Sequence, residues 1–268
     1  INDADFSITG GAEPTPTPDP SPSPSPDPSP SPSPDPSPSP SQDPSPSPSP
    51  SPDPSPSPTP DPPATEAPDT SISRGPTRGK FVVGRKASYV FDSSQSGSTF
   101  ECTVDGSDIP CATKSLVLRK LKPGDHVFTV AARNGDGLVD ATPATARFSV
   151  VFNERVLTRS TPGWRTVKNR DTYKNTFVTT SRRGRVLSVD VQDVTRVALL
   201  VIKGKGLGRL AVSLDGDRLK VLPTRAKRLK VSRLKLVTRS SRPLSGTLKI
   251  RSLDAKPVAI DGIGLFQR

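Results

Sequence analysis

A proline–serine repeat divides this chain into a segment that cannot form regular structure and segments that can. Between residues 13 and 63, Pro alternates with Ser or Thr almost without a break. Every second residue lacks a backbone N–H, and no apolar face is present, so the tract favours polyproline II over helix or sheet. Acidic residues punctuate it at a spacing of about eight residues, namely Asp19, Asp27, Asp35, Asp43, Asp53 and Asp61. Residues 13–66 are therefore predicted to be a disordered linker, either a plain or glycosylated spacer or a ligand for a proline-binding domain.

The charge is divided as unevenly as the composition. The net charge is +12, yet residues 1–70 contain 11 acidic and no basic residues, whereas residues 151–268 contain 27 basic and 8 acidic residues. The chain opens on Ile1 and contains no Met, which favours a mature or truncated piece of a longer polypeptide. No apolar run is long enough to predict a membrane span.

Residues 67–151 show the pattern of a small antiparallel β-sandwich. Period-two apolar positions predict strands near residues 86–91, 98–104, 115–118, 126–132 and 146–151, separated by turn sequences such as Asp105-Gly106. Cys102 and Cys111 flank this turn and are predicted to form a disulfide. A metal site is disfavoured, because only His126 could add a further ligand of these types. The disulfide implies an oxidising compartment, and hence an extracellular, secreted or cell-surface protein.

Two stretches of this segment carry a family resemblance. FECTVDG at residues 100–106, followed by Pro110-Cys111, and PGDHVFTVAARN at residues 123–134 resemble an Ig-like domain that recurs in secreted actinobacterial proteins. The resemblance implies an Ig-like sandwich without a defined ligand, with His126 in a structural position.

Residues 152–268 also predict an all-β fold. Strands are expected at residues 186–191, 197–202, 209–214, 247–253 and 258–265, with VALLVI at 197–202 buried on both faces. The glycine-rich loop at residues 204–208 lacks the context of a phosphate-binding loop and is predicted to be a hairpin between strands. Asp215 and Asp261 are assigned to Asp-Gly turns.

The order of these elements again carries a resemblance. Gly163-Trp164, Tyr173, the VALLVI strand, the GKGLG loop, GTLKIRSL and the final VAIDGIGL resemble a galactose-binding-like jelly-roll, similar to carbohydrate-binding modules. Residues 1–12, with INDADFSI, resemble the end of a domain that precedes C-terminal extensions in reprolysin-like zinc metallopeptidases. That resemblance implies a parent enzyme and assigns no catalysis to this chain.

Two sets of residues are candidates for binding. Trp164 and Tyr173 could stack on sugar rings, or Trp164 could fill the core. The second set could bind a polyanion or form a solvated strand face; it comprises Arg182, Arg183, Arg185, Arg225, Lys227, Arg228, Lys230, Arg233 and Lys235. Aromatic residues are not interleaved with these charges, so nucleic acid is disfavoured as a partner.

No catalytic motif stands out: there is one His, and HExxH, GxSxG and CxxC are missing. We therefore expect no enzyme, no cofactor and a monomer. The favoured function is that of a non-catalytic accessory region of an extracellular protein, which provides spacing and binds a glycan or an anionic cell-envelope polymer. The alternatives are a purely structural stalk or adhesion segment, and the tail of a secreted metallopeptidase.

Overall fold

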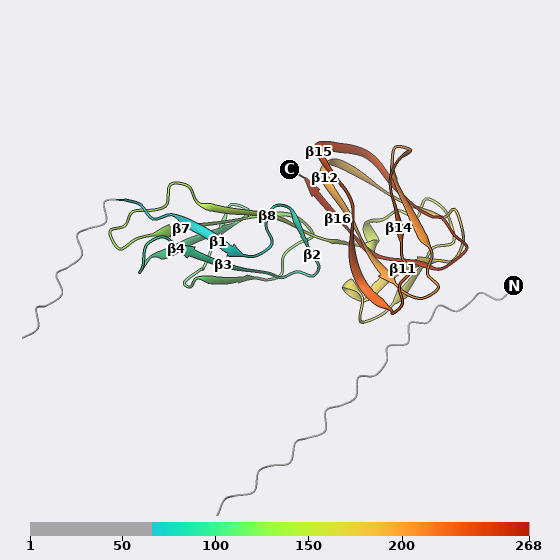
Figure 1. Ribbon diagram of the computed structural model, residues 1–268, viewed down its shortest axis with the longest axis horizontal. Coiled ribbons are helices and arrows are strands. Elements are labelled where there is room, and N and C mark those ends of the chain that lie inside the picture. Colours follow the sequence, from blue (N-terminus) through green and yellow to red (C-terminus); the bar gives the residue numbers. More distant parts are fainter. Residues whose placement is uncertain (1–65, 268) are drawn as a thin grey trace, which may run out of the picture. The chain divides into compact units, whose positions relative to one another are not determined.

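The computed structural model describes residues 66–267, and the regular secondary structure of these residues is almost entirely β-strand (Figure 1). Two short 3-10 turns, η1 (Glu154–Val156) and η2 (Tyr173–Asn175), are the helical elements among them. Within this part of the chain no helix is long and apolar enough to cross a membrane. The predictions for the linker and for residues 1–12 fall on residues 1–65, outside the described residues.

The first eight strands form two sheets. One sheet has the order β1 (Thr70–Arg74), β3 (Ala87–Ser93) and β6 (Ser115–Leu118). The other has the order β2 (Lys80–Val82), β8 (Ala144–Val150), β7 (Gly124–Arg133), β4 (Thr99–Val104) and β5 (Ser107–Ile109). All neighbours are antiparallel except β2 and β8. The predicted β-sandwich is confirmed for this segment, which we call the N-terminal sandwich.

The core of the N-terminal sandwich is built from the alternating apolar positions of its strands. Tyr89 and Phe91 from β3 are buried with Phe128 from β7 and Phe148 from β8. The rings of Tyr89 and Phe128 stack with centroids 4.3 Å apart. Aromatic burial of this kind contributes about 1.5–3 kcal/mol per side chain from area alone, so this cluster stabilises the sandwich.

The predicted disulfide between Cys102 and Cys111 is present, with the two Cα atoms 6.0 Å apart. It joins β4 to the segment after β5, across the hairpin that turns at Asp105-Gly106. Asp105 and Gly106 both have positive φ, 52° and 78°, as a type I′ turn requires. Both cysteines are buried in the core cluster.

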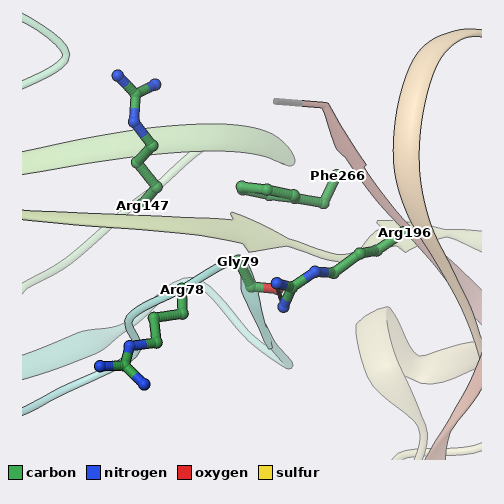
Figure 2. A pocket seen from close by; sticks show the side chains of 5 residues that line it. All are labelled: Arg78, Gly79, Arg147, Arg196 and Phe266. Carbon is green, nitrogen blue, oxygen red and sulfur yellow. Dashed lines mark hydrogen bonds between the residues drawn. The ribbon is translucent and has the colours of Figure 1, made fainter. Parts of the chain in front are cut away.

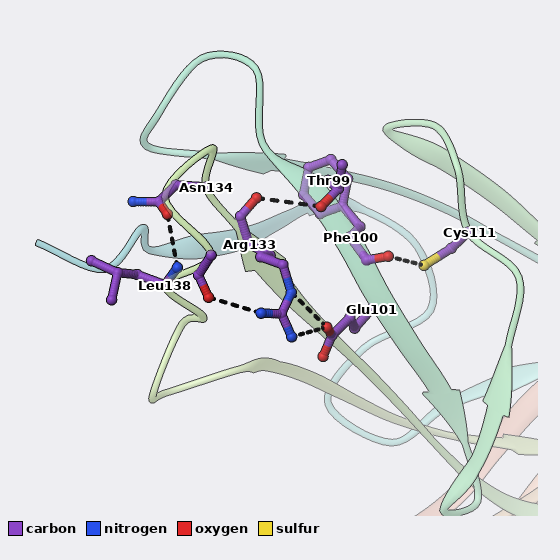
Figure 3. A network of polar contacts seen from close by, with 8 residues as sticks. Thr99, Phe100, Glu101, Cys111, Arg133, Asn134 and Leu138 are labelled. Atoms are coloured by element: carbon purple, nitrogen blue, oxygen red, sulfur yellow. Dashed lines mark hydrogen bonds and ion pairs between the residues drawn. The ribbon is translucent and has the colours of Figure 1, made fainter. Parts of the chain in front are cut away.

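A polar network fixes the turn that follows β7, as Figure 3 shows. The Arg133 guanidinium donates to Glu101 on the neighbouring strand at 2.6 and 2.9 Å and to the Gly137 carbonyl at 2.8 Å. Asn134 accepts from the Leu138 amide at 2.9 Å. The Cys111 sulfur lies 3.3 Å from the Phe100 carbonyl; because it belongs to a disulfide it carries no proton, so this is a contact and not a hydrogen bond.

His126 lies at the start of β7 with both ring nitrogens occupied. Nδ1 is 2.7 Å from an oxygen of the Asp105 carboxylate, and Nε2 is 2.8 Å from the Lys122 carbonyl. The ring is buried against Phe148, with centroids 5.3 Å apart. These contacts fit the structural position that the sequence predicts.

The remaining strands form one eight-stranded sheet. The path runs β10 (Arg165–Lys168), β11 (Thr176–Thr180), β16 (Val258–Gln267), β12 (Val186–Lys203), β15 (Lys230–Ser252), β13 (Arg209–Leu214) and β14 (Asp217–Pro223), and β9 (Phe152–Asn153) also pairs with β16. β12 and β15 are 18 and 23 residues long and pair with each other along their length, with several register shifts. On its other side, the second half of β12 pairs with β16. The last residues of β15 pair with β13 on their other side. The sheet therefore curls into two layers around one core, which we call the C-terminal sandwich, and the predicted β-sandwich is confirmed here too.

Three local predictions for this segment are wrong. The strands expected at 186–191 and 197–202 are one strand, because the chain continues through a bulge in which Asp193 has a φ of 53°. The loop at 204–208 is not a hairpin: β12 and β13 are not neighbours, because β15 lies between them. Asp261 is not in a turn but inside β16, fully buried.

The Asp-Gly pair at Asp215-Gly216 shows why such a dipeptide is ambiguous. There both residues have positive φ and close the β13–β14 hairpin. At Asp261-Gly262 the glycine is needed for another reason, because a Cβ on Gly262 would lie 2.3 Å from the Phe152 carbonyl oxygen of the adjacent β9. Close approach of two strands, and not a turn, accounts for that glycine.

Candidate functional site

The two aromatic candidates are part of the interior. Trp164 is 5% exposed and lies in the main core cluster of the C-terminal sandwich. Tyr173 is 8% exposed, packs with Val151 and Leu200, and donates its hydroxyl to the Val151 carbonyl at 3.1 Å. The structure places the two rings in different clusters and presents neither face to solvent. A sugar-stacking site at Trp164 and Tyr173 is therefore not supported, and the core interpretation of Trp164 fits the structure.

The basic candidates have a different environment, starting with the turn between β11 and β12. Arg182 and Arg183 are exposed and Arg185 is half-buried. The turn is tied to the end of β15, because the Gly184 amide donates to the Ser252 carbonyl at 2.8 Å and the Ser252 amide donates to the Arg185 carbonyl at 2.9 Å.

Beside this turn, arginine side chains gather around Gly163. A Cβ placed on Gly163 would lie 3.5 Å from atoms of both Arg182 and Arg185. Arg165 and Arg182 also line a small cavity of about 130 Å³ with Gly163, Thr179 and neighbouring residues. Within residues 66–267, the buried Nε of Arg185 has no hydrogen-bond partner. Two arginines, Arg165 and Arg182, thus line this small cavity, and Arg185 lies beside Gly163 at its border.

The second basic group, Arg225, Lys227 and Arg228, is exposed on the loop between β14 and β15. This loop is bound to the glycine-rich loop after β12: the Gly204 amide donates to the Thr224 carbonyl at 3.0 Å, and the Ala226 amide donates to the Gly204 carbonyl at 2.9 Å. Gly208 in turn donates to the Pro257 carbonyl at 2.9 Å.

These backbone bonds bring four connections to one end of the C-terminal sandwich. One further hydrogen bond joins the two groups of loops: the Leu253 amide donates to the Arg209 carbonyl at 3.0 Å. Leu253 follows Ser252, and Arg209 follows the glycine-rich loop. Residues 181–185, 204–208, 224–229 and 253–257 therefore share one rim. The exposed or half-buried basic residues that they contribute are Arg182, Arg183, Arg185, Lys205, Arg225, Lys227, Arg228 and Lys256, which we call the basic rim. Lys205 and Lys256 were not singled out from the sequence.

Lys230, Arg233 and Lys235 continue from the rim along the first part of β15. Over residues 230–239 this strand pairs with β12 on one side, and its pairing with β13 is confined to residues 248–252. Lys203 of β12 lies opposite Lys230. Burial lowers the pKa of Lys203, and the nearby charges of Lys235 and Lys230 lower it further. Like charges are thus crowded together along this strand.

Salt bridges to these cations are few within the described part of the chain. Residues 66–267 form four salt bridges or His–Asp pairs, and only Arg209–Asp254 lies in the C-terminal sandwich. None of the nine basic candidates takes part in an ion pair there. No group of three or more His, Cys, Asp or Glu side chains in residues 66–267 is arranged to hold a metal ion.

No protein-family model and no curated protein matches this chain. Solved structures to which it is similar include a family 6 carbohydrate-binding module, CsCBM6-3 from Clostridium stercorarium in complex with cellobiose, at 10% identity and a TM-score of 0.34, covering 44% of this chain and 93% of that one. A second is from a study of promiscuous carbohydrate-binding modules of the β-sandwich superfamily, at 12% identity and a TM-score of 0.33. The match covers 76% of this chain and 99% of that one. A third is a Paenibacillus xanthan lyase, at 7% identity and a TM-score of 0.36. The match covers 74% of this chain and 26% of that one. At these identities and TM-scores, the likeness transfers neither a ligand nor a site to this chain.

Proposed function

We propose that this chain is a non-catalytic accessory region of an extracellular protein, and that its basic rim binds an anionic polymer such as an acidic polysaccharide or another anionic cell-envelope polymer. In this proposal, residues 67–151 are an Ig-like spacer, residues 152–268 are a jelly-roll binding domain, and the proline–serine tract gives reach. The observation that carries it is the convergence of eight basic side chains on one rim, none of which forms a salt bridge within residues 66–267. The one carboxylate in these connections, Asp254, is paired with Arg209.

Such a rim suits a polymer with repeated charges. Each contact between a basic side chain and an anionic group releases condensed counterions, so binding gains from several weak contacts at once and weakens steeply with salt. Arginine adds specificity for carboxylate, sulfate and phosphate, because its planar fork can donate two parallel hydrogen bonds. Five members of the rim are arginines.

A neutral sugar chain suits the structure less well. Sugar recognition of that kind uses exposed aromatic faces. The sequence has one Trp and two Tyr, and all three, Trp164, Tyr89 and Tyr173, are buried. No Phe is among the exposed large hydrophobic residues of the described chain. Charge, and not stacking, is the recognition chemistry that these surfaces offer.

The competing structural role is strongest for Lys230, Arg233 and Lys235. Charged side chains on an exposed strand edge prevent another strand from pairing with it, so these three residues could protect β15 without any ligand. The same reasoning does not extend to the rim, because its residues lie on connections between strands. The two roles can thus be separated by mutating the loops alone.

The test is retention of the chain on heparin, an acidic bacterial polysaccharide and cellulose over a range of salt concentrations. With about four ionic contacts, affinity for heparin should fall on the order of 100-fold between about 50 and 200 mM salt. A rim variant carries Arg182→Gln, Arg183→Gln, Lys227→Gln and Arg228→Gln. A matched control carries four Gln substitutions at exposed basic residues of the N-terminal sandwich, Arg74, Lys86, Arg119 and Lys122.

We expect the rim variant to lose retention on both acidic matrices and the control to keep it. Equal loss in the two variants would mean that net charge alone drives binding, which contradicts a site at the rim. Absence of retention of the unmodified chain on every matrix would favour the structural stalk, and salt-resistant retention on cellulose would favour a neutral-glycan site.

A further inference from the structure

A second cationic pocket lies away from the basic rim and is lined by residues of both sandwiches. Its cavity has a volume of about 510 Å³ and is bordered by Arg78, Gly79, Arg147, Arg196 and Phe266. Figure 2 shows the Arg196 guanidinium next to Gly79, with the Phe266 ring on the neighbouring side and the guanidinium groups of Arg78 and Arg147 pointing away from Arg196. No acidic residue lines the pocket.

The backbone around Gly79 holds this arrangement in place. The Gly79 amide donates to the Arg147 carbonyl at 2.8 Å, and its own carbonyl accepts from Arg196 at 3.2 Å. A Cβ on Gly79 would lie 2.7 Å from the Phe266 ring, and its φ is 70°. Arg78 precedes it with a φ of 53°, a left-handed conformation that a residue with a side chain rarely adopts. Residues in such conformations cluster at ligand-binding sites.

Arg196 is the central cation of the pocket. Its guanidinium carbon lies 5.7 Å from the centroid of the Phe266 ring. Within residues 66–267 its side chain forms one hydrogen bond, to the Gly79 carbonyl, so most of its N–H donors have no partner in this part of the chain. Its direct cross-strand neighbour on β15 is another cation, Arg239. Like charges directly opposite each other are unfavourable in a sheet, and a bound anion would relieve the repulsion.

The other two arginines add to the positive field. Arg78 and Arg147 are exposed, and like Arg196 they take part in none of the ion pairs of residues 66–267. Their long side chains can turn toward a ligand at the mouth of the pocket. Phe266 is 8% exposed, so it forms a wall and not a stacking platform.

We propose that this pocket is an oxyanion-binding site, which takes a carboxylate, sulfate or phosphate group on a ligand of about one or two sugar rings. Arg196 binds the anion with its planar fork, and Arg78 and Arg147 close on it from the mouth. The site is independent of the basic rim, which the connections at 181–185, 204–208, 224–229 and 253–257 form.

The test is a titration of the full chain with glucuronate, inorganic sulfate and inorganic phosphate, followed by NMR of the Gly79 amide and the Arg196 Nε–H, with glucose as the neutral probe. We expect saturable shifts with a Kd in the millimolar range for at least one anion and none for glucose. Saturable shifts with glucuronate alone would identify the carboxylate of a sugar acid as the bound group. Saturable shifts with the inorganic ions alone would identify a sulfate or phosphate group.

Arg147→Gln should weaken binding at least fivefold, and Arg196→Lys, which keeps the charge but loses the planar fork, should weaken it as well; Arg119→Gln is the matched control. Unsaturable shifts, equal shifts with glucose, or equal affinity in Arg147→Gln and Arg119→Gln would overturn the proposal. The four-residue rim variant should bind these anions normally, and Arg147→Gln should keep heparin retention, so the two sites fail or succeed separately.

Discussion

The buried carboxylate of Asp261 should make the C-terminal sandwich less stable as the pH rises above about 4. This side chain is 0% exposed in β16. One oxygen accepts hydrogen bonds from the Tyr173 amide at 3.1 Å and from the Ser232 hydroxyl, and the other has no partner in the described residues. Burial raises the pKa of Asp261 to about 6; the two hydrogen bonds oppose this rise, and the nearby Glu154 carboxylate adds to it.

The magnitude follows from the difference between the folded and unfolded pKa of Asp261. The ordinary value is 3.8, so folding raises the pKa by about two units. Each unit corresponds to 1.36 kcal/mol, which gives roughly 3 kcal/mol. Between pH 4 and 6 the folded state binds more protons than the unfolded state, so the free energy of unfolding falls as the pH rises through this window. The stabilisation from the protonated carboxyl is fully present below about pH 4 and is lost above about pH 6.

Asp261→Asn removes this titration while leaving an oxygen that can accept the hydrogen bonds from Tyr173 and Ser232. Urea unfolding can be followed by the fluorescence of Trp164, the single Trp of the chain, which is buried in the same sandwich. A chelator in the buffer prevents adventitious divalent cations from neutralising the carboxylates.

The informative quantity is the unfolding free energy of Asp261→Asn minus that of the unmodified chain. This difference should grow by about 2.5 kcal/mol from pH 4 to pH 8, whatever constant offset the amide introduces. Asp171→Asn, at an exposed position, should show no such growth. A difference that stays flat across this range would show that the pKa of Asp261 is not raised by folding.

Two further predictions concern stability. Replacing Cys102 and Cys111 by Ala opens a ten-residue loop, so the N-terminal sandwich should lose roughly 2.7 kcal/mol in the chain-entropy model, which lowers its Tm by roughly 10–20 °C in calorimetry; an unchanged Tm after reduction of the unmodified chain would contradict this. Gly262→Ala places a Cβ 2.3 Å from the Phe152 carbonyl oxygen, so β9 or β16 must move. The free energy of unfolding should fall by roughly 1–3 kcal/mol, which lowers the urea midpoint. Gly135→Ala has open space around it and is the control; equal midpoints for the two variants would show that the strands yield freely.

Much of the local structure was predictable because it depends on short-range chemistry. Period-two apolar positions identify strands such as β7, and positive-φ turns select Asp-Gly, as at Asp105-Gly106 and Asp215-Gly216. The disulfide followed from two cysteines that flank such a turn. In each case the residues involved lie within about ten positions of one another.

The features that the sequence did not predict depend on distant partners. Asp261-Gly262 has the same letters as a turn, yet it lies in a strand because β9, more than 100 residues earlier, packs against the glycine. Trp164 beside a glycine could equally be exposed or buried until the two layers close over it. The basic rim exists because backbone hydrogen bonds join connections separated by tens of residues, which no local pattern contains.

Binding at the basic rim can be tested directly by amide NMR mapping of a heparin-derived hexasaccharide on the full chain at low salt. We expect the amides of Gly184, Gly206, Ala226 and Lys256, one from each connection of the basic rim, to shift together with one affinity, and those of Gly97 and Gly106 in the N-terminal sandwich to stay unchanged. Shifts that are absent from the rim, or that are spread evenly over both sandwiches, would contradict it.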